Sequence, residues 1–257
     1  MPQKMKVFGP QALFAVSAGV LFLTGPSADA AVITETYTGG VDNTPIPGWT
    51  NPNPGDVIDF NLSGGDTGLS SSQGGLNRSF KTLTGFTSGV TSFTVDYVIR
   101  TRPDELQFGI GSSAGLNGGA FAETNMLLGI QIRNQDLDLI LPNALQDGDL
   151  TTSSVQDPAN NETVSVRLEV DVVNDLVDVF YDTGSAGATT EVASNIDLNW
   201  GGLVTDTAQI DRFVAATRSD TALRSVVITT TAVIPEPASL ALLGLGGVCL
   251  LGRRRRA

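Results

Sequence analysis

Residues 164–182 read VSVRLEVDVVNDLVDVFYD, and this stretch decides the fold class of the chain. Apolar and polar side chains alternate from Val164 to Val172, which is typical of a β-strand with one buried and one solvated face. Asn174 and Asp175 then supply a two-residue turn, and residues 176–181 alternate again. The stretch therefore predicts an antiparallel β-hairpin.

A two-residue turn fixes which residues of the hairpin face each other. On the buried face it pairs three apolar couples: Val172 with Val177, Val170 with Val179, and Leu168 with Tyr181. On the solvated face it places Asp171 opposite Asp178, where facing like charges destabilise the strand pair. Three explanations stay open. The carboxylates are hydrated, which we favour, or a cation lies between them, or the turn is longer than two residues.

The rest of the central region continues the β pattern, with short apolar runs broken by turn residues. Strands are expected at residues 32–37, 57–62, 92–100, 106–110, 126–133, 136–141, 163–173, 176–181, 210–215 and 224–233. Three segments rich in Gly, Pro or Ser are expected to be ordered surface loops: residues 38–56, 63–75 and 109–119. About ten strands in about 200 residues predict an all-β, two-sheet jelly-roll sandwich over residues 31–234.

Residues 1–30 have the order of a secretory signal peptide. Lys4 and Lys6 precede an apolar stretch at residues 12–23, and a helix-breaking Gly-Pro pair follows. Ala28 and Ala30 then supply the small residues of an A-x-A cleavage site. We expect a signal helix here, cleaved after Ala30.

Residues 235–257 form a second membrane-directed segment. Pro235, Glu236 and Pro237 make a rigid, extended tripeptide, because each proline fixes φ and lacks an N–H group. The apolar residues 238–252 would span about 22 Å as a helix, less than the roughly 30 Å hydrocarbon core. The segment ends in a basic membrane stop: Arg253, Arg254, Arg255 and Arg256. A short transmembrane helix with its arginines in the cytoplasm is expected.

These three parts, in this order at the C-terminal end, resemble the PEP-CTERM sorting signal of Gram-negative bacteria over residues 235–256. The resemblance implies that an exosortase, a membrane peptidase, processes the tail. It further implies a precursor anchored in the inner membrane, which then reaches the cell envelope, the cell surface or the extracellular matrix. It implies nothing about the activity of the exported domain.

Composition excludes several classes of function. The end segments hold 6 of the 15 basic and 2 of the 27 acidic residues, so residues 31–234 carry a formal charge of −16. Such a domain repels nucleic acid and anionic lipid. The chain has no histidine, and its single cysteine, Cys249, lies in the apolar tail segment. Ser-His-Asp catalysis, histidine-ligated zinc and a disulfide in the exported domain are therefore excluded.

A second resemblance concerns the central domain. Residues 164–182, followed by AQIDRFVAATRSDTALRSVVI at 208–228, are similar to the closing half of concanavalin A-like or laminin-G-like sandwiches. In those folds a long hairpin precedes a final strand that returns to the first sheet. The resemblance implies the same two-sheet architecture here.

One acidic motif invites an enzymatic interpretation. Residues 169–174 resemble the E-x-D-x-x-E motif of laminarinase-like glycoside hydrolases, and Glu169 and Asp171 would share one face of a strand. However, Asn174 occupies the place of the acid–base glutamate. We therefore expect no catalytic residue, and a hydrolase would require Glu169 and Asp171 to line an open groove beside a third carboxylate.

No metal or cofactor is expected either. Asn134, Asp136 and Asp138 match only the first half of a calcium loop, and the sequence that follows alternates like a strand. Asp147 and Asp149 flank a glycine and are more simply part of a turn.

The sequence as a whole favours an exported, non-enzymatic protein that binds or organises extracellular polysaccharide. Trp49, Trp200 and Tyr181 are the candidates for stacking on sugars, although core packing is the commoner role of such residues. The alternatives are a laminarinase-like hydrolase and a purely structural or adhesive surface protein without a small ligand.

Overall fold

The computed structural model describes residues 30–51, 58–63, 66–71, 77–101, 106–113, 126–133, 136–142, 144–145, 159, 161–200, 203–217 and 222–231. These residues belong to one compact unit, Ala28–Val233. The expected signal helix and the tail from Pro235 to Arg256, with its expected transmembrane helix, lie outside the described residues. No helix within the described ranges is long and apolar enough to cross a membrane.

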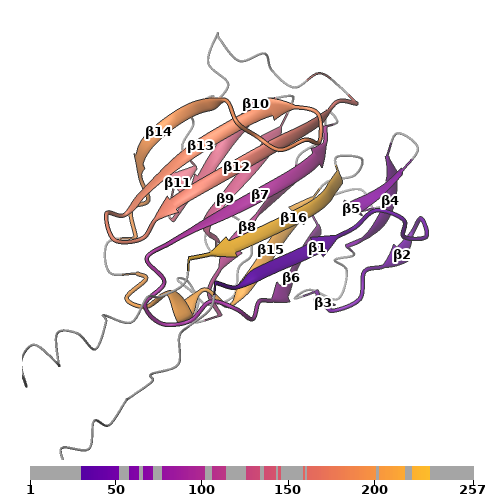
Figure 1. Ribbon diagram of the computed structural model, residues 1–257. Helices are drawn as coiled ribbons and strands as arrows, with labels where there is room; N and C mark the ends of the chain where they lie inside the picture. Colours follow the sequence, from indigo (N-terminus) through magenta and orange to yellow (C-terminus); the bar gives the residue numbers. More distant parts are fainter. Residues whose placement is uncertain are drawn as a thin grey trace, which may run out of the picture. The chain divides into compact units, whose positions relative to one another are not determined.

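The described residues form two antiparallel sheets, which are stacked with the larger one toward the viewer in Figure 1. The larger sheet has the order β14 (Glu191–Asp197), β13 (Leu176–Thr183), β12 (Thr163–Asp171), β7 (Ser92–Arg100), β16 (Ala222–Thr230), β5 (Asp66–Ser70), β4 (Asp59–Ser63) and β2 (Thr44–Pro45), and β1 (Val32–Thr36) also pairs with β16. The smaller sheet has the order β11 (Ala144–Leu145), β10 (Asp136–Leu141), β9 (Met126–Arg133), β8 (Leu106–Gly111), β15 (Arg212–Thr217), β6 (Asn77–Thr82) and β3 (Trp49–Thr50). One short 3₁₀ turn, Thr207–Gln209, precedes β15.

The core lies between the two sheets, and β7 shows how the sequence builds it. Burial alternates along this strand, so that Phe93, Val95, Tyr97 and Ile99 are at most 1% exposed. The ring of Tyr97 meets that of Phe108 from β8 edge to face, with 4.7 Å between the centroids. Burial of these side chains on the inner faces of both sheets is the main stabilising force. The predicted all-β, two-sheet sandwich is confirmed.

Several short strands were not predicted. β2 and β3 lie inside the expected loop 38–56, and β5 lies inside the expected loop 63–75. β6 and β14 have the polar sequences NRSFKT and EVASNID, which show no clear alternation of apolar and polar residues. Such strands are recruited by pairing with a neighbour, which local sequence does not reveal.

The predicted register of the central hairpin is wrong by two residues. β12 ends at Asp171 and β13 begins at Leu176, so the turn has four residues, and Val170 faces Val177. The cause is the Asp171 carboxylate, whose Oδ1 accepts hydrogen bonds from the backbone N–H groups of Val173 and Asn174, both at 3.0 Å. A shift of two residues preserves the period of two, so Leu168, Val170, Val177, Val179 and Tyr181 are buried as predicted. Two residues differ from the prediction, because Val172 is only partly buried and Ser165 is buried. The third explanation for the facing aspartates, a longer turn, is therefore the right one.

Part of the outer face of the smaller sheet is buried among the described residues. Strand pairing places Gln107, Met126, Ile140 and Val214 on the side away from the larger sheet, and each is at most 1% exposed. The Gln107 Nε2 group donates a 2.7 Å hydrogen bond to Oε1 of Gln131 on the same face. The larger sheet has a row of partly exposed polar side chains on its outer face, and a candidate site lies there.

Candidate functional site

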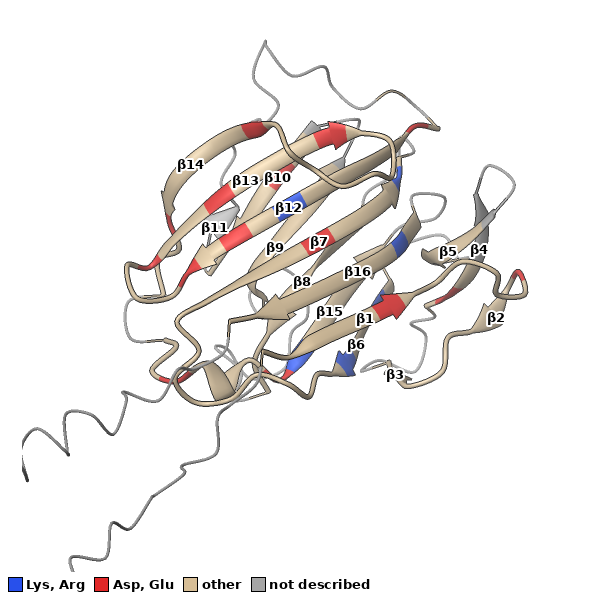
Figure 2. Cartoon of the chain, viewed as in Figure 1, with Lys and Arg blue, Asp and Glu red and all other residues tan. Residues whose placement is uncertain are grey.

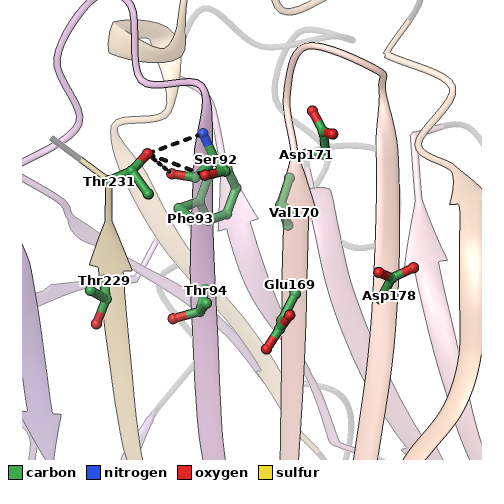
Figure 3. Close-up of a pocket in the computed structure, with 9 residues that line it drawn as sticks. All are labelled: Ser92, Phe93, Thr94, Glu169, Val170, Asp171, Asp178, Thr229 and Thr231. Atoms are coloured by element: carbon green, nitrogen blue, oxygen red, sulfur yellow. Dashed lines mark hydrogen bonds between the residues drawn. The ribbon is translucent and has the colours of Figure 1, made fainter. Parts of the chain in front are cut away.

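The outer face of the larger sheet carries a depression of about 290 Å³ (Figure 3). Its described lining combines four hydroxyl-bearing, three carboxyl-bearing and two apolar residues: Ser92, Thr94, Thr229, Thr231, Glu169, Asp171, Asp178, Phe93 and Val170. None of these lining residues is basic. The depression is therefore a surface of hydrogen-bond acceptors and hydroxyl groups.

Four of the lining residues form one row across four neighbouring strands. Thr229 of β16 is the partner of Thr94 of β7, and Thr94 is the partner of Glu169 of β12. Glu169 is in turn the partner of Asp178 of β13. Side chains paired in this way have Cβ atoms about 4.5–5.5 Å apart. Figure 3 shows the four along one line, and we call Thr229, Thr94, Glu169 and Asp178 the polar row.

Hydrogen bonds hold both sides of the polar row. Thr231, directly after β16, donates its hydroxyl to the Ser92 carbonyl at 2.7 Å and its backbone N–H to the same oxygen at 3.0 Å. On the other side, Oδ1 of Asp178 accepts a 2.7 Å hydrogen bond from the backbone N–H of Asn195 in β14. The row is thus fixed by strand pairing, by the contact between Thr231 and Ser92 two residues along β16 and β7, and by the contact of Asp178 with β14.

Asp171 lines the depression but serves the hairpin turn. In addition to the two backbone contacts, its Oδ2 accepts a 2.6 Å hydrogen bond from the Asn174 side chain. That bond, together with those from the backbone, lowers the pKa of the Asp171 carboxyl below its ordinary value. Asp171 is therefore ionised at neutral pH and cannot act as a proton donor.

The next row along the strands holds an ion pair and an aromatic ring. Arg167 of β12 has Asp96 of β7 as its partner on one side and Phe180 of β13 on the other. The Arg167 Nε atom lies 2.6 Å from Asp96 Oδ1, while its Nη1 lies 3.8 Å from Glu169 Oε1. Acidic and basic positions therefore mix on this part of the sheet, as Figure 2 shows along β7, β12 and β13. Phe180 is partly exposed on the same face.

Of the three aromatic residues predicted to stack on sugars, Trp200 and Tyr181 are buried in the core, and Trp49 is partly buried against it. Trp200 is 3% exposed, and its Nε1 donates a 2.8 Å hydrogen bond to the Leu127 carbonyl. Tyr181 is also 3% exposed. Trp49 packs edge to face on Phe213, with 5.8 Å between the centroids. Large aromatic side chains bury the most apolar area, so their burial in the core stabilises the fold most.

The structure does bring Glu169 and Asp171 together, and it adds Asp178 beside them. The residue that sequence reasoning missed is Phe180. The signal for it was present, because Phe180 stands between Asp178 and Asp182 in the alternation of β13 and so belongs to the solvated face.

The later residues of the candidate calcium motif lie in a strand and not in a loop. Asp136 and Asp138 belong to β10, as the alternation indicated, whereas Asn134, Asp147 and Asp149 lie outside the described residues. Among the residues that the structure describes, no group of three or more acidic side chains is arranged to hold a metal ion.

Comparison with known protein families finds a match at the C-terminal end of the chain. Residues 233–256 match the PEP-CTERM protein-sorting motif. The resemblance seen in the tail sequence is confirmed. A search of curated proteins found no match.

Solved structures similar to this chain include three lectins. The winged bean acidic lectin complexed with methyl-α-D-galactose is 13% identical, with 79% of this chain and 99% of that chain covered and a TM-score of 0.48. Lectin II from Ulex europaeus is 9% identical, with 78% and 98% covered and a TM-score of 0.47. Peanut lectin with a nine-residue peptide is 12% identical, with 81% and 100% covered and a TM-score of 0.44. At this similarity the likeness concerns the general fold and assigns no ligand or site to this chain.

Proposed function

We propose that the chain is an exported, non-enzymatic protein that binds polysaccharide through the outer face of its larger sheet. The observation that carries the proposal is the polar row beside Phe180. Carboxylates and hydroxyls at fixed spacing are the groups that hydrogen-bond sugar hydroxyls, and an exposed aromatic ring packs against the apolar face of a sugar ring. A depression of about 290 Å³ is of the size of a small ligand site.

Both ends of the chain support the proposed export. The sorting motif supports processing of the tail by an exosortase-type peptidase, with Pro235, Glu236 and Pro237 as the recognition element and the four terminal arginines as the cytoplasmic stop. At the other end, β1 begins at Val32, directly after the expected cleavage site at Ala30. The Ala31 N–H donates a 3.0 Å hydrogen bond to Thr230 Oγ1 of β16, so the first residue of the expected mature protein is already bound to the sheet. The envelope, the cell surface or the extracellular matrix is then the destination.

Affinity electrophoresis in gels containing soluble polysaccharides tests this function. We expect retardation of the purified protein, loss of retardation for Phe180→Ala, and full retardation for Val41→Ala, a control at a residue that is 70% exposed and outside the depression. If no polysaccharide retards the protein, or if Phe180→Ala migrates like the parent in every gel, the binding proposal fails and a structural or adhesive role replaces it.

One observation favours a second candidate, a glycoside hydrolase, because Glu169, Asp171 and Asp178 line the same depression. A hydrolase of this kind needs a sheltered acid and a second carboxylate. Asp171 is committed to the turn, and Glu169 has a side chain that is 45% exposed and lies 3.8 Å from Arg167. We therefore expect no release of reducing ends from laminarin-type glucans. Release that is abolished by Glu169→Gln would establish the hydrolase instead.

A further inference from the structure

The register of the larger sheet indicates how a bound polysaccharide would be oriented relative to the strands. This inference rests on the proposed function. The line of paired residues continues from the polar row onto a fifth strand, because Val32 of β1 is the partner of Thr229. Neighbouring strands lie about 4.8 Å apart, so the row from Val32 to Asp178 spans about 19 Å over five strands. That interstrand spacing is about the length of one sugar ring in an extended chain. We infer that the ligand is an uncharged polysaccharide that lies across the strands, with about one sugar over each strand and with the sugar over β13 against Phe180, two residues from Asp178.

Each strand contributes a side chain suited to one sugar. Val32 is 63% exposed and offers apolar contact to a ring face, while Thr229 and Thr94 offer hydroxyl groups. Glu169 and Asp178 offer carboxylate oxygens, which accept strong hydrogen bonds from sugar hydroxyls. A chain running along the strands would instead pass from the polar row to the ion pair of Arg167 and Asp96, whose charged groups already satisfy each other at 2.6 Å.

The negative charge of the depression favours an uncharged polymer over an anionic one. The described lining holds three carboxylates and no basic residue, and Asp178 takes part in no ion pair among the described residues. A polyuronate or sulfated chain would bring like charges against these groups and be rejected. A chain of cationic amino sugars would be repelled by the Arg167 guanidinium, which lies 3.8 Å from the Glu169 carboxylate. Arg167 already interacts with that carboxylate, so a sugar ammonium group would have to compete with it.

A length series of neutral, β-linked glucose oligosaccharides tests the direction. Calorimetric titration of the full protein should give affinities that rise with each added sugar and level off at about five, the number of strands in the row. The isosteric variants Thr94→Val and Thr229→Val should each weaken binding of the five-sugar ligand by about three- to tenfold, since each removes one hydrogen-bonding hydroxyl. Their melting temperatures check that the fold is intact.

Thr163→Val is the matched control. Thr163 lies on β12 six residues before Glu169, about 20 Å from the polar row along the same strand. Its affinity should stay within about twofold of the parent. A plateau at one or two sugars, or a loss for Thr163→Val equal to that for Thr94→Val, would overturn the direction.

Competition between polymers tests the charge. A neutral glucan should displace the labelled five-sugar ligand, whereas a polyuronate of equal length should not, and a de-N-acetylated hexosamine polymer should compete more weakly than the glucan. Tighter binding of either charged polymer would overturn the inference while leaving polysaccharide binding in place. Absence of binding by every polymer would instead remove the proposed function itself.

Discussion

Replacing Asp171 with alanine should destabilise the domain through the hairpin turn. The substitution removes two backbone hydrogen bonds at 3.0 Å and one from the Asn174 side chain at 2.6 Å. These bonds are solvent-exposed, so each contributes about 0.5 kcal/mol, and the total loss is about 1.5 kcal/mol. In a domain of about 200 residues this lowers the melting temperature by about 3–6 °C. Asp171→Asn keeps Oδ1 and should lose only about 1–2 °C.

The dependence of this effect on pH provides a second check. The hydrogen bonds lower the pKa of Asp171 from its ordinary value of 3.8 in the folded state. A carboxyl with a lowered folded pKa contributes stability above its unfolded pKa and loses that contribution as the pH falls through its folded pKa. The difference in melting temperature between parent and Asp171→Ala should therefore be full at pH ~7 and shrink below pH ~4.

Thermal melts of the parent, Asp171→Ala, Asp171→Asn and Glu191→Ala, followed by circular dichroism, measure both effects. Glu191 is an exposed acid at the start of the edge strand β14, so its variant controls for loss of a surface charge. Equal melting temperatures for Asp171→Ala and the parent would refute the four-residue turn and the register built on it.

Three further predictions concern other parts of the domain. Asp182 accepts hydrogen bonds from the backbone and hydroxyls of Thr189 and Thr190, which lower its pKa to about 2; NMR titration should give this value, and a midpoint near 4 would contradict the contacts. Its contribution to stability should be full above pH ~4 and lost as the pH falls toward ~2, which the melting temperature of Asp182→Ala relative to the parent measures. Trp200→Ala should lower the free energy of unfolding by about 3–5 kcal/mol in urea titrations, because it empties a core site and leaves the Leu127 carbonyl without its donor; a loss below about 1 kcal/mol would mean that Trp200 is not in the core. Millimolar calcium should leave the melting temperature unchanged, and a rise would restore the idea of a cation between facing carboxylates.

The fold class could be predicted from the sequence because it depends on a local feature, the alternation of apolar and polar residues along each strand. Alternation over residues 164–171 predicted the burial of the β12 side chains correctly except at Ser165, which is buried, even though the predicted register was wrong. The turn length could not be predicted, because the side-chain contacts of Asp171 to the following backbone compete with a two-residue turn. β14 could not be predicted either, since its polar residues pair only because β13 lies beside them.

Only part of the candidate site could be predicted from the sequence. Glu169 and Asp171 drew attention through their spacing, which is local. The polar row joins Thr94, Glu169 and Thr229, which lie far apart along the chain and meet only through the pairing of β7 with β12 and β16. The candidates Trp200 and Tyr181 were wrong because both side chains are buried in the core, whereas Phe180 is kept outside by its position in the alternation.

Methyl NMR of the protein titrated with a neutral five-sugar oligosaccharide tests most directly whether the outer face of the larger sheet is the ligand surface. The methyl signals of Val32, Thr94 and Thr229 should shift together and saturate at one ligand concentration, while Val41 and the core methyls of Val164 stay in place. Saturable shifts confined to residues outside the polar row, with Thr94 and Thr229 unmoved, would contradict the claim.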